Sequence, residues 1–233
     1  GMLCNGVPLP ERETTLPQVL REAGYATCAC GKVHLRPHEV SLDDHTRIQE
    51  YEGDGPYYGF ERVHLTDDYK LGEYLRWIDE EHPEWSDEAR DVLEGRSRSG
   101  NCESWHSEIP AELHQSSWIA DRSIDFLQSA GEEPFFLWCS FVDPHHPMNP
   151  PAPYAEMHDR SAIEVPDRPD LSGFGPHWAA KQQGTANMTA DQWRETIALY
   201  LGMISLIDDC VGRVLEALKR QGLAENTVVG FVN

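Results

Sequence analysis

A lysine and a histidine, Lys32 and His34, stand two positions apart in the chain, directly after Gly31. The small-residue run that precedes them, residues 25–30, is typical of a buried strand. Because residues two apart in an extended backbone project to the same side, both side chains are expected to converge on one point at the end of this strand. Two groups that can both carry positive charge suit an anionic substrate.

A pair of histidines, His145 and His146, follows a second apolar run, residues 134–141. A continuous apolar run between turn signals predicts a strand covered on both faces, as in a parallel sheet. Ligands collect beyond the carboxyl ends of such strands. The sequence therefore predicts that the histidine pair shares one sheet edge with Lys32 and His34, and the prolines around the pair restrict its backbone.

The elements that must position these side chains alternate between helices and apolar strands. Apolar residues at helical spacing and a capping Thr14 or Thr15 indicate where the helices lie. The predicted helices cover residues 16–23, 111–129 and 189–221, and the predicted strands cover 25–30, 134–141 and 227–232. This alternation predicts an α/β fold with a mostly parallel sheet covered by helices.

Residues from about 36 to 112 differ from the rest of the chain because they are acidic, aromatic and rich in turn residues. We interpret them as an irregular excursion from the sheet, within one domain over residues 1–233. A chain of 233 residues is compatible with one large α/β domain. Such a domain can bury roughly 70 % of its unfolded surface, so it needs neither a disulfide nor a metal ion to fold.

The charge balance restricts the partners of the chain, because it has 40 acidic and 19 basic residues and a formal net charge of −21. This charge repels nucleic-acid phosphates and anionic bilayers, so we expect no nucleic-acid and no membrane partner. No apolar run approaches the about 18–20 residues of a membrane span. The six cysteines are widely spread without a Cys-x-x-Cys pair, so buried, inert thiols are expected and the compartment stays open.

Three other chemistries fit the residues less well. Gly31-Lys32 resembles part of a P-loop, but the required spacing is absent and Val33 offers no hydroxyl for magnesium. A serine hydrolase would need a Gly-x-Ser-x-Gly elbow, which the chain lacks. A zinc site could use the histidine pair and the cysteines, but their spacing fits no tetrahedral set.

Residues 15–27, followed by Gly31-Lys32-Val33-His34, resemble the second signature of the sulfatases, which belong to the alkaline-phosphatase-like hydrolases. Residues 134–147 look like the next core strand and substrate-histidine loop of this family. Residues 114–122 are similar to a helix that many bacterial members share, and residues 206–227 are similar to the long helix and strand that precede the downstream metal motif of the family. The resemblance covers most of the chain except the excursion at 36–112. It implies an incomplete alkaline-phosphatase-like fold and hydrolysis of a small-molecule sulfate ester.

The resemblance also implies roles for the matching residues. Lys32 would bind a sulfate oxygen and stabilise charge as the ester bond breaks. His34 would lie near a formylglycine hydrate and assist proton removal when sulfate is expelled. His145 would contact the sulfate and the leaving oxygen and act as general acid. His146 and His114 would be accessory substrate-binding residues.

The remaining catalytic parts of the family have no match in the chain. The family nucleophile lies in a Cys/Ser-x-Pro-x-Arg motif, and Cys4 lacks the arginine of that motif, so we do not assign it the role. The resemblance implies formylglycine and a divalent cation, with calcium expected, in the full-length family member, but no metal ligand is assigned here. We expect the chain to be an internal piece of a longer sulfatase, essentially inactive alone and able to self-associate through open sheet edges.

Two other functions stay open on the sequence. A hydrolase of phosphonate or phosphate esters from the same superfamily would keep this fold and much of this site. A non-catalytic binding module would keep the α/β core without the chemistry. Motifs for a nucleophile and for metal ligands in the flanking reading frame would favour the enzyme.

Overall fold

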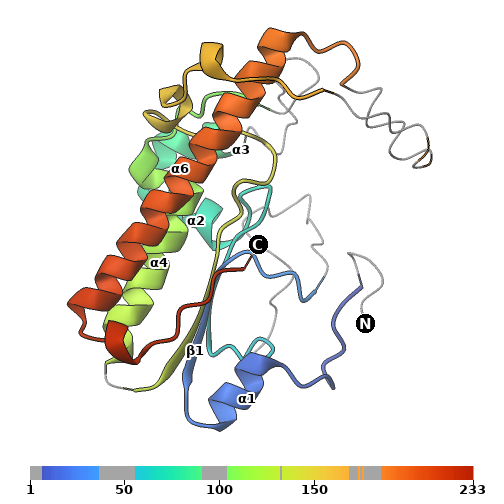
Figure 1. Ribbon diagram of the computed structural model, residues 1–233. Coiled ribbons are helices and arrows are strands. Elements are labelled where there is room, and N and C mark those ends of the chain that lie inside the picture. Colours follow the sequence, from blue (N-terminus) through green and yellow to red (C-terminus); the bar gives the residue numbers. More distant parts are fainter. Residues whose placement is uncertain are drawn as a thin grey trace.

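The described residues of the computed structural model are 7–36, 56–90, 104–131, 133–167, 173, 175 and 185–232. They form a small sheet with helices packed on it (Figure 1). The strands are β1 (Ala26–Gly31), β2 (Arg62–Leu65) and β3 (Phe135–Ser140), in the spatial order β2-β1-β3. Both neighbours run parallel to β1, so the predicted parallel α/β sheet is confirmed.

The helices begin where the sequence provides capping side chains. The hydroxyl of Thr15 accepts a hydrogen bond at the start of α1, and Thr189 and Gln192 form a capping box at the start of α6. Helix α4 begins after His114, whose ring accepts a hydrogen bond from the Ser116 N–H. The helices are α1 (Leu16–Glu22), α2 (Glu73–Glu81), α3 (Ser86–Arg90), α4 (Gln115–Ala130) and α6 (Ala190–Arg220). Single 3-10 turns cover Pro83–Trp85, Ala111–Leu113, Tyr154–Glu156, Arg160–Ala162 and Ala224–Asn226.

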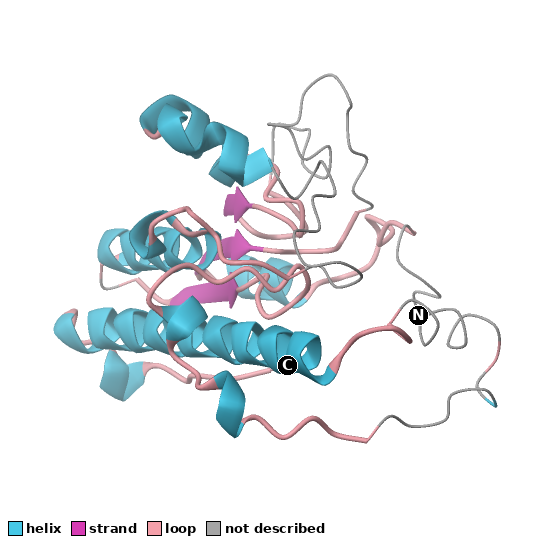
Figure 2. Cartoon of the chain, turned by 90° about the horizontal axis from the view of Figure 1, so that it is seen from above, coloured by secondary structure: helices cyan, strands magenta, loops and turns pink. Residues whose placement is uncertain are grey.

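Helices α4 and α6 run side by side and form successive layers on one side of the sheet (Figure 1). Figure 2 shows the three strands next to one another with the long helix α6 as an outer layer. Leu206 and Cys210 of α6 pack on Ala120 of α4. None of the helices in the described parts of the chain is long and apolar enough to cross a membrane.

The hydrophobic core lies between β1 and helices α2 and α4. Cys28 and Cys30 project from β1 into this layer and pack with Trp118 and Ile119 of α4. Their sulfurs lie 3.7 Å apart, and both side chains are fully buried, as expected for the cysteines of this chain. Contact with the Cys28 thiol and burial raise the pKa of Cys30, which keeps its thiol protonated and inert.

The expected irregular excursion at 36–112 contains regular structure where it is described. Its residues include strand β2 and helices α2 and α3, so part of this segment belongs to the sheet itself. A strand of four residues is too short to give a clear alternation of polar and apolar side chains, which is why the sequence did not reveal it. Residues 37–55 and 91–103 of the excursion lie outside the described part.

The strand predicted over residues 227–232 is wrong, because the structure leaves this segment extended and unpaired within the described residues. Val228 and Phe231 are 98 % and 81 % exposed. An apolar, β-branched run favours extended backbone, but only hydrogen bonds to a neighbouring strand make it part of a sheet. Strand β3 also departs from the prediction of two covered faces, since Trp138 is partly exposed.

Candidate active site

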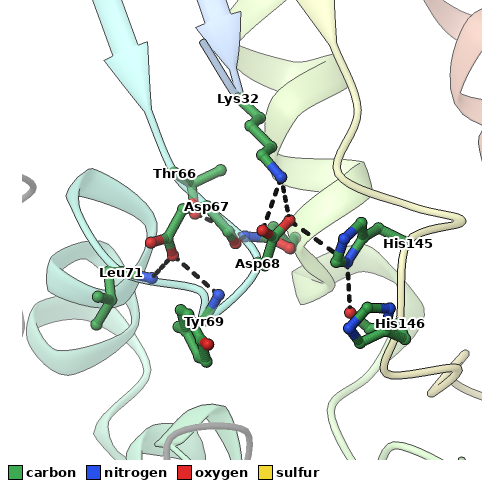
Figure 3. Close-up of polar contacts among 9 residues, drawn as sticks. Lys32, Thr66, Asp67, Asp68, Tyr69, Leu71, His145 and His146 are labelled. Atoms are coloured by element: carbon green, nitrogen blue, oxygen red, sulfur yellow. Dashed lines mark hydrogen bonds and ion pairs between the residues drawn. The ribbon is translucent and has the colours of Figure 1, made fainter. Parts of the chain in front are cut away.

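Three charged or ionisable side chains follow the carboxyl ends of the three adjacent strands. Lys32 follows β1, Asp68 lies in the loop after β2, and His145 lies in the loop after β3. Figure 3 shows the Asp68 carboxylate between the Lys32 ammonium and the His145 ring. The topology of the sheet explains this meeting, because parallel strands end at one edge.

The contacts at this edge are short. The two carboxylate oxygens of Asp68 lie 2.5 and 2.7 Å from Lys32 Nζ, and one of them lies 3.6 Å from His145 Nδ1. The backbone N–H of Lys32 donates to the Ser140 carbonyl over 3.0 Å, which ties the start of this loop to β3. The Lys32 and Asp68 side chains are about one-fifth exposed, at 20 % and 22 %. The charged pair is therefore reachable from solvent but partly shielded from it.

The loop after β3 fixes the tautomer of His145. His145 Nδ1 lies 2.7 Å from the carbonyl oxygen of His146, and the two rings stack with centroids 4.1 Å apart. A carbonyl only accepts hydrogen bonds, so Nδ1 carries a proton. In the neutral ring Nε2 is then the acceptor nitrogen, and in the protonated ring Nε2 is a second donor that can give its proton to a substrate.

The loop after β2 holds Asp68 in place through its neighbours. The carboxylate of Asp67 accepts the Leu71 N–H over 2.9 Å, and burial raises the pKa of Asp67 to about 6. The Gln115 amide, at the start of α4, donates to the Thr66 hydroxyl over 2.6 Å and to the Asp67 carbonyl over 2.8 Å. These contacts tie the loop to α4, so the position of Asp68 is set by the core.

The loop after β3 is also supported from α4. The buried carboxylate of Asp143 accepts the Ser116 hydroxyl over 2.7 Å, and His114 Nδ1 lies 3.8 Å from the same oxygen. Burial raises the pKa of Asp143 to about 6. Burial and the nearby Lys70 charge lower the pKa of His114 to about 3. A neutral imidazole and a buried carboxyl therefore lie beneath the segment that carries His145.

The raised pKa of Asp143 predicts a pH-dependent effect of Asp143→Asn. An unfolded aspartate has a pKa of about 3.9, so the stabilising contribution of the protonated form is complete below about pH 4 and is lost as pH rises through about 6. Urea unfolding measures the free energy of unfolding of both chains at pH 5 and 7.5. The value for the variant, relative to that for the original chain, should be about 1 kcal/mol higher at pH 7.5 than at pH 5. Asp125→Asn, which removes a carboxylate from a half-exposed ion pair, serves as the matched control. A pH-independent difference for Asp143→Asn would contradict the raised pKa.

The structure brings some of the predicted site residues together. Lys32 and His145 meet through Asp68, and His146 stacks on His145. His34 is exposed two residues beyond Lys32. Strand β1 ends at Gly31, close to the predicted end, and buried Val33 lies between Lys32 and His34. The convergence of His34 with the others stays a prediction.

His114 occupies a different position from the other four residues. It is 1 % exposed, begins helix α4 and lies against Asp143. This location suits support of the loop that carries His145. The substrate-binding role expected for His114 stays a prediction.

Asp68 is the site residue that sequence reasoning missed. It lies inside the supposed excursion, where an acidic residue carries little information because acidic residues are frequent there. The available signal was the short run Val63–Leu65 followed, after Thr66, by two aspartates, which places carboxylates after a strand. Parallel pairing of that strand with β1 could not be read from four residues.

The sulfatase resemblance implies a divalent cation and formylglycine, and the described residues do not provide a site for the cation. They contain no group of three or more His, Cys, Asp or Glu side chains that could hold a metal ion. Cys4 lies outside the described residues.

Comparison with known proteins decides the family. A family model described as Sulfatase matches residues 1–232. The chain belongs to the sulfatase family. This sulfatase chain is 31 % identical over 241 residues to an arylsulfatase of Clostridium perfringens, with 95 % of the chain and 46 % of the relative covered. It is 26 % identical over 248 residues to the multifunctional alkaline phosphatase superfamily protein PehA of Trinickia caryophylli, with 98 % and 48 % covered.

Solved structures show the same fold. The sulfatase chain matches a phosphonate monoester hydrolase of Agrobacterium radiobacter with a TM-score of 0.69 and 23 % identity, covering 96 % of this chain and 47 % of that one. A phosphonate monoester hydrolase from Silicibacter pomeroyi matches with a TM-score of 0.62 and 18 % identity, with 96 % and 47 % covered. The alkaline-phosphatase-like α/β fold is thereby confirmed. The chain spans about half the length of the relatives it matches.

Proposed function

We propose that this chain supplies the substrate-binding and proton-transferring part of an enzyme that hydrolyses a small-molecule sulfate ester. The observation that carries the proposal is the meeting of Lys32 and His145 at one sheet edge, in a chain whose family is sulfatase. These two residues come from loops more than a hundred positions apart in sequence. Their shared position is the geometry that binding of a single anion requires.

Each residue has a defined task in the proposed reaction. The Lys32 ammonium binds the non-bridging oxygens of the sulfate group and stabilises the charge that develops on them. Protonated His145 donates from Nε2 to the oxygen of the leaving alcohol. His34 would act as a base, the role that the sulfatase resemblance implies for it. His146 keeps the His145 ring oriented through its carbonyl and also borders the substrate, and His114 contributes to the substrate site from beneath the loop.

A phosphonate or phosphate ester hydrolase is the second candidate. The solved structures that match the chain include phosphonate monoester hydrolases, and one curated relative is described as multifunctional. An anion site built from a lysine and histidines accepts either central atom. A non-catalytic binding module is the third candidate, and it would bind the esters without cleaving them.

Paired assays test these candidates. The longest reading frame that contains this chain is purified and given 4-nitrophenyl sulfate, 4-nitrophenyl phenylphosphonate and 4-nitrophenyl phosphate. We expect kcat/KM to be highest for the sulfate ester. A higher value for the phosphonate ester would favour the second candidate, and hydrolysis of none of the three esters would contradict the enzymatic proposal.

The remaining partners follow from charge and exposure. We propose that the enzyme binds neither nucleic acid nor membranes, because the net charge of −21 repels both phosphate backbones and anionic lipids. Any divalent cation would be held by residues other than those described, with calcium the ion we expect from the resemblance. Self-association of the chain is proposed to occur through the partly exposed edge strand β3 and the exposed residues 228–232.

A further inference from the structure

A carboxylate stands where an anion is expected to bind. Asp68 contacts Lys32 with both oxygens and approaches His145 with one of them. The Lys32–Asp68 pair therefore has no net charge, and the only further positive charge among these three residues is that of protonated His145. The negative charge of Asp68 therefore weakens the attraction of this site for an anion (Figure 3).

Contacts within the protein itself set the position of Asp68. The residue before it, Asp67, is buried and accepts backbone N–H groups from Tyr69 and Leu71. Gln115 of α4 binds the same loop through a side-chain and a backbone oxygen. These contacts hold the backbone of Asp68 at the sheet edge. Its charge thus stays close to any anion bound by Lys32.

We propose that Asp68 determines specificity, because its charge makes the site select esters with one negative charge over esters with two. This inference rests on the proposed function and deepens it by naming the charge class of the substrate. A sulfate monoester and a phosphonate monoester each carry one negative charge, whereas a phosphate monoester carries close to two above about pH 7. Repulsion by Asp68 acts about twice as strongly on the phosphate monoester.

The test compares esters that differ in charge but share the leaving group. In the longest reading frame that contains this chain, we expect Asp68→Asn to raise kcat/KM for 4-nitrophenyl phosphate relative to 4-nitrophenyl sulfate by roughly tenfold at pH 8, the order expected for one partly screened charge a few ångströms away. The ratio for 4-nitrophenyl phenylphosphonate relative to the sulfate ester should stay within about twofold, because both are monoanions.

Two further variants separate charge from structure. Asp68→Glu keeps the negative charge and should keep the original preference. Asp125→Asn removes one negative charge from a half-exposed position on α4 and should leave all ratios unchanged. Thermal unfolding of each variant shows whether the fold is intact. An unchanged ratio in folded Asp68→Asn, or an equal change in Asp125→Asn, would overturn the role of Asp68.

A binding experiment on the chain itself tests charge selection independently of catalysis. Methyl sulfate and methyl phosphate are titrated at pH 8, and the His145 and His146 ring protons are followed by NMR. Asp68→Asn should improve the affinity for methyl phosphate over that for methyl sulfate by roughly tenfold. If the reading frame cleaves no ester while this shift occurs, the enzymatic proposal fails and the charge selection stands. If neither anion binds, or both affinities change equally, the charge selection is wrong.

Discussion

Replacing His145 by alanine is expected to lower kcat/KM for phenyl sulfate by about 10²–10⁴-fold in the longest reading frame that contains this chain. The proposed task of His145 is to protonate the leaving oxygen from Nε2, with Nδ1 held by the His146 carbonyl. Phenolate is a poor leaving group, so it depends strongly on this proton. For 4-nitrophenyl sulfate, whose leaving group is much more stable as an anion, the loss should be at least tenfold smaller.

The comparison with Lys32→Ala separates proton transfer from anion binding. In the proposed reaction Lys32 contacts the sulfate group and not the leaving oxygen, so its loss should lower kcat/KM by about 10²–10³-fold for both esters alike. His158→Ala serves as the histidine control, because that ring contacts Ser205 of α6 instead. Equal losses for the two esters in His145→Ala would show that His145 is not the general acid.

Gly31→Ala is expected to reduce the free energy of unfolding by about 3 kcal/mol or more, which is a large part of the stability of an ordinary domain. Gly31 has a φ of +96°, in the region that side chains avoid. A methyl group there would place its carbon 1.8 Å from the Ser140 carbonyl oxygen. That oxygen belongs to the backbone of β3 and accepts the Lys32 N–H, so it cannot move aside without breaking the sheet edge.

Urea unfolding of the chain measures this effect, with Gly212→Ala as the matched control. Gly212 lies within α6, is exposed and has no atom within 4 Å of an added methyl group. Alanine favours helix over glycine, so this variant should gain up to about 1 kcal/mol. If Gly31→Ala were as stable as the original chain, the tight contact between β1 and β3 at the site would be wrong.

Local signals in the sequence predicted helices α1, α4 and α6 and strands β1 and β3. Thr15 and the Thr189–Gln192 capping box begin α1 and α6 as the residue types indicate, and Thr15 is one of the two candidates that the sequence offered for its helix. The continuous apolar run at 134–141 became β3, although Trp138 is partly exposed because β3 lies at the edge of the described sheet. An apolar pattern indicates which residues are suited to burial, but it does not indicate whether a neighbouring strand covers them.

Pairing between distant segments explains what the sequence could not reveal. Residues 227–232 have the composition of a strand, yet no described residue hydrogen-bonds to them in a ladder. Strand β2 is the opposite case, because its four residues give a weak local signal and pairing with β1 defines it. Asp68 was missed for the same reason: its place beside Lys32 depends on that pairing, while Lys32 and His145 follow strands that are visible locally.

A structure of the longest reading frame that contains this chain, crystallised with an aryl sulfate bound to a His34→Ala variant, tests the central claim most directly. The account predicts that one sulfate group lies within hydrogen-bond distance, about 3 Å, of both Lys32 Nζ and a ring nitrogen of His145. A sulfate group bound elsewhere, with Lys32 still paired to Asp68 and no contact to His145, would contradict it.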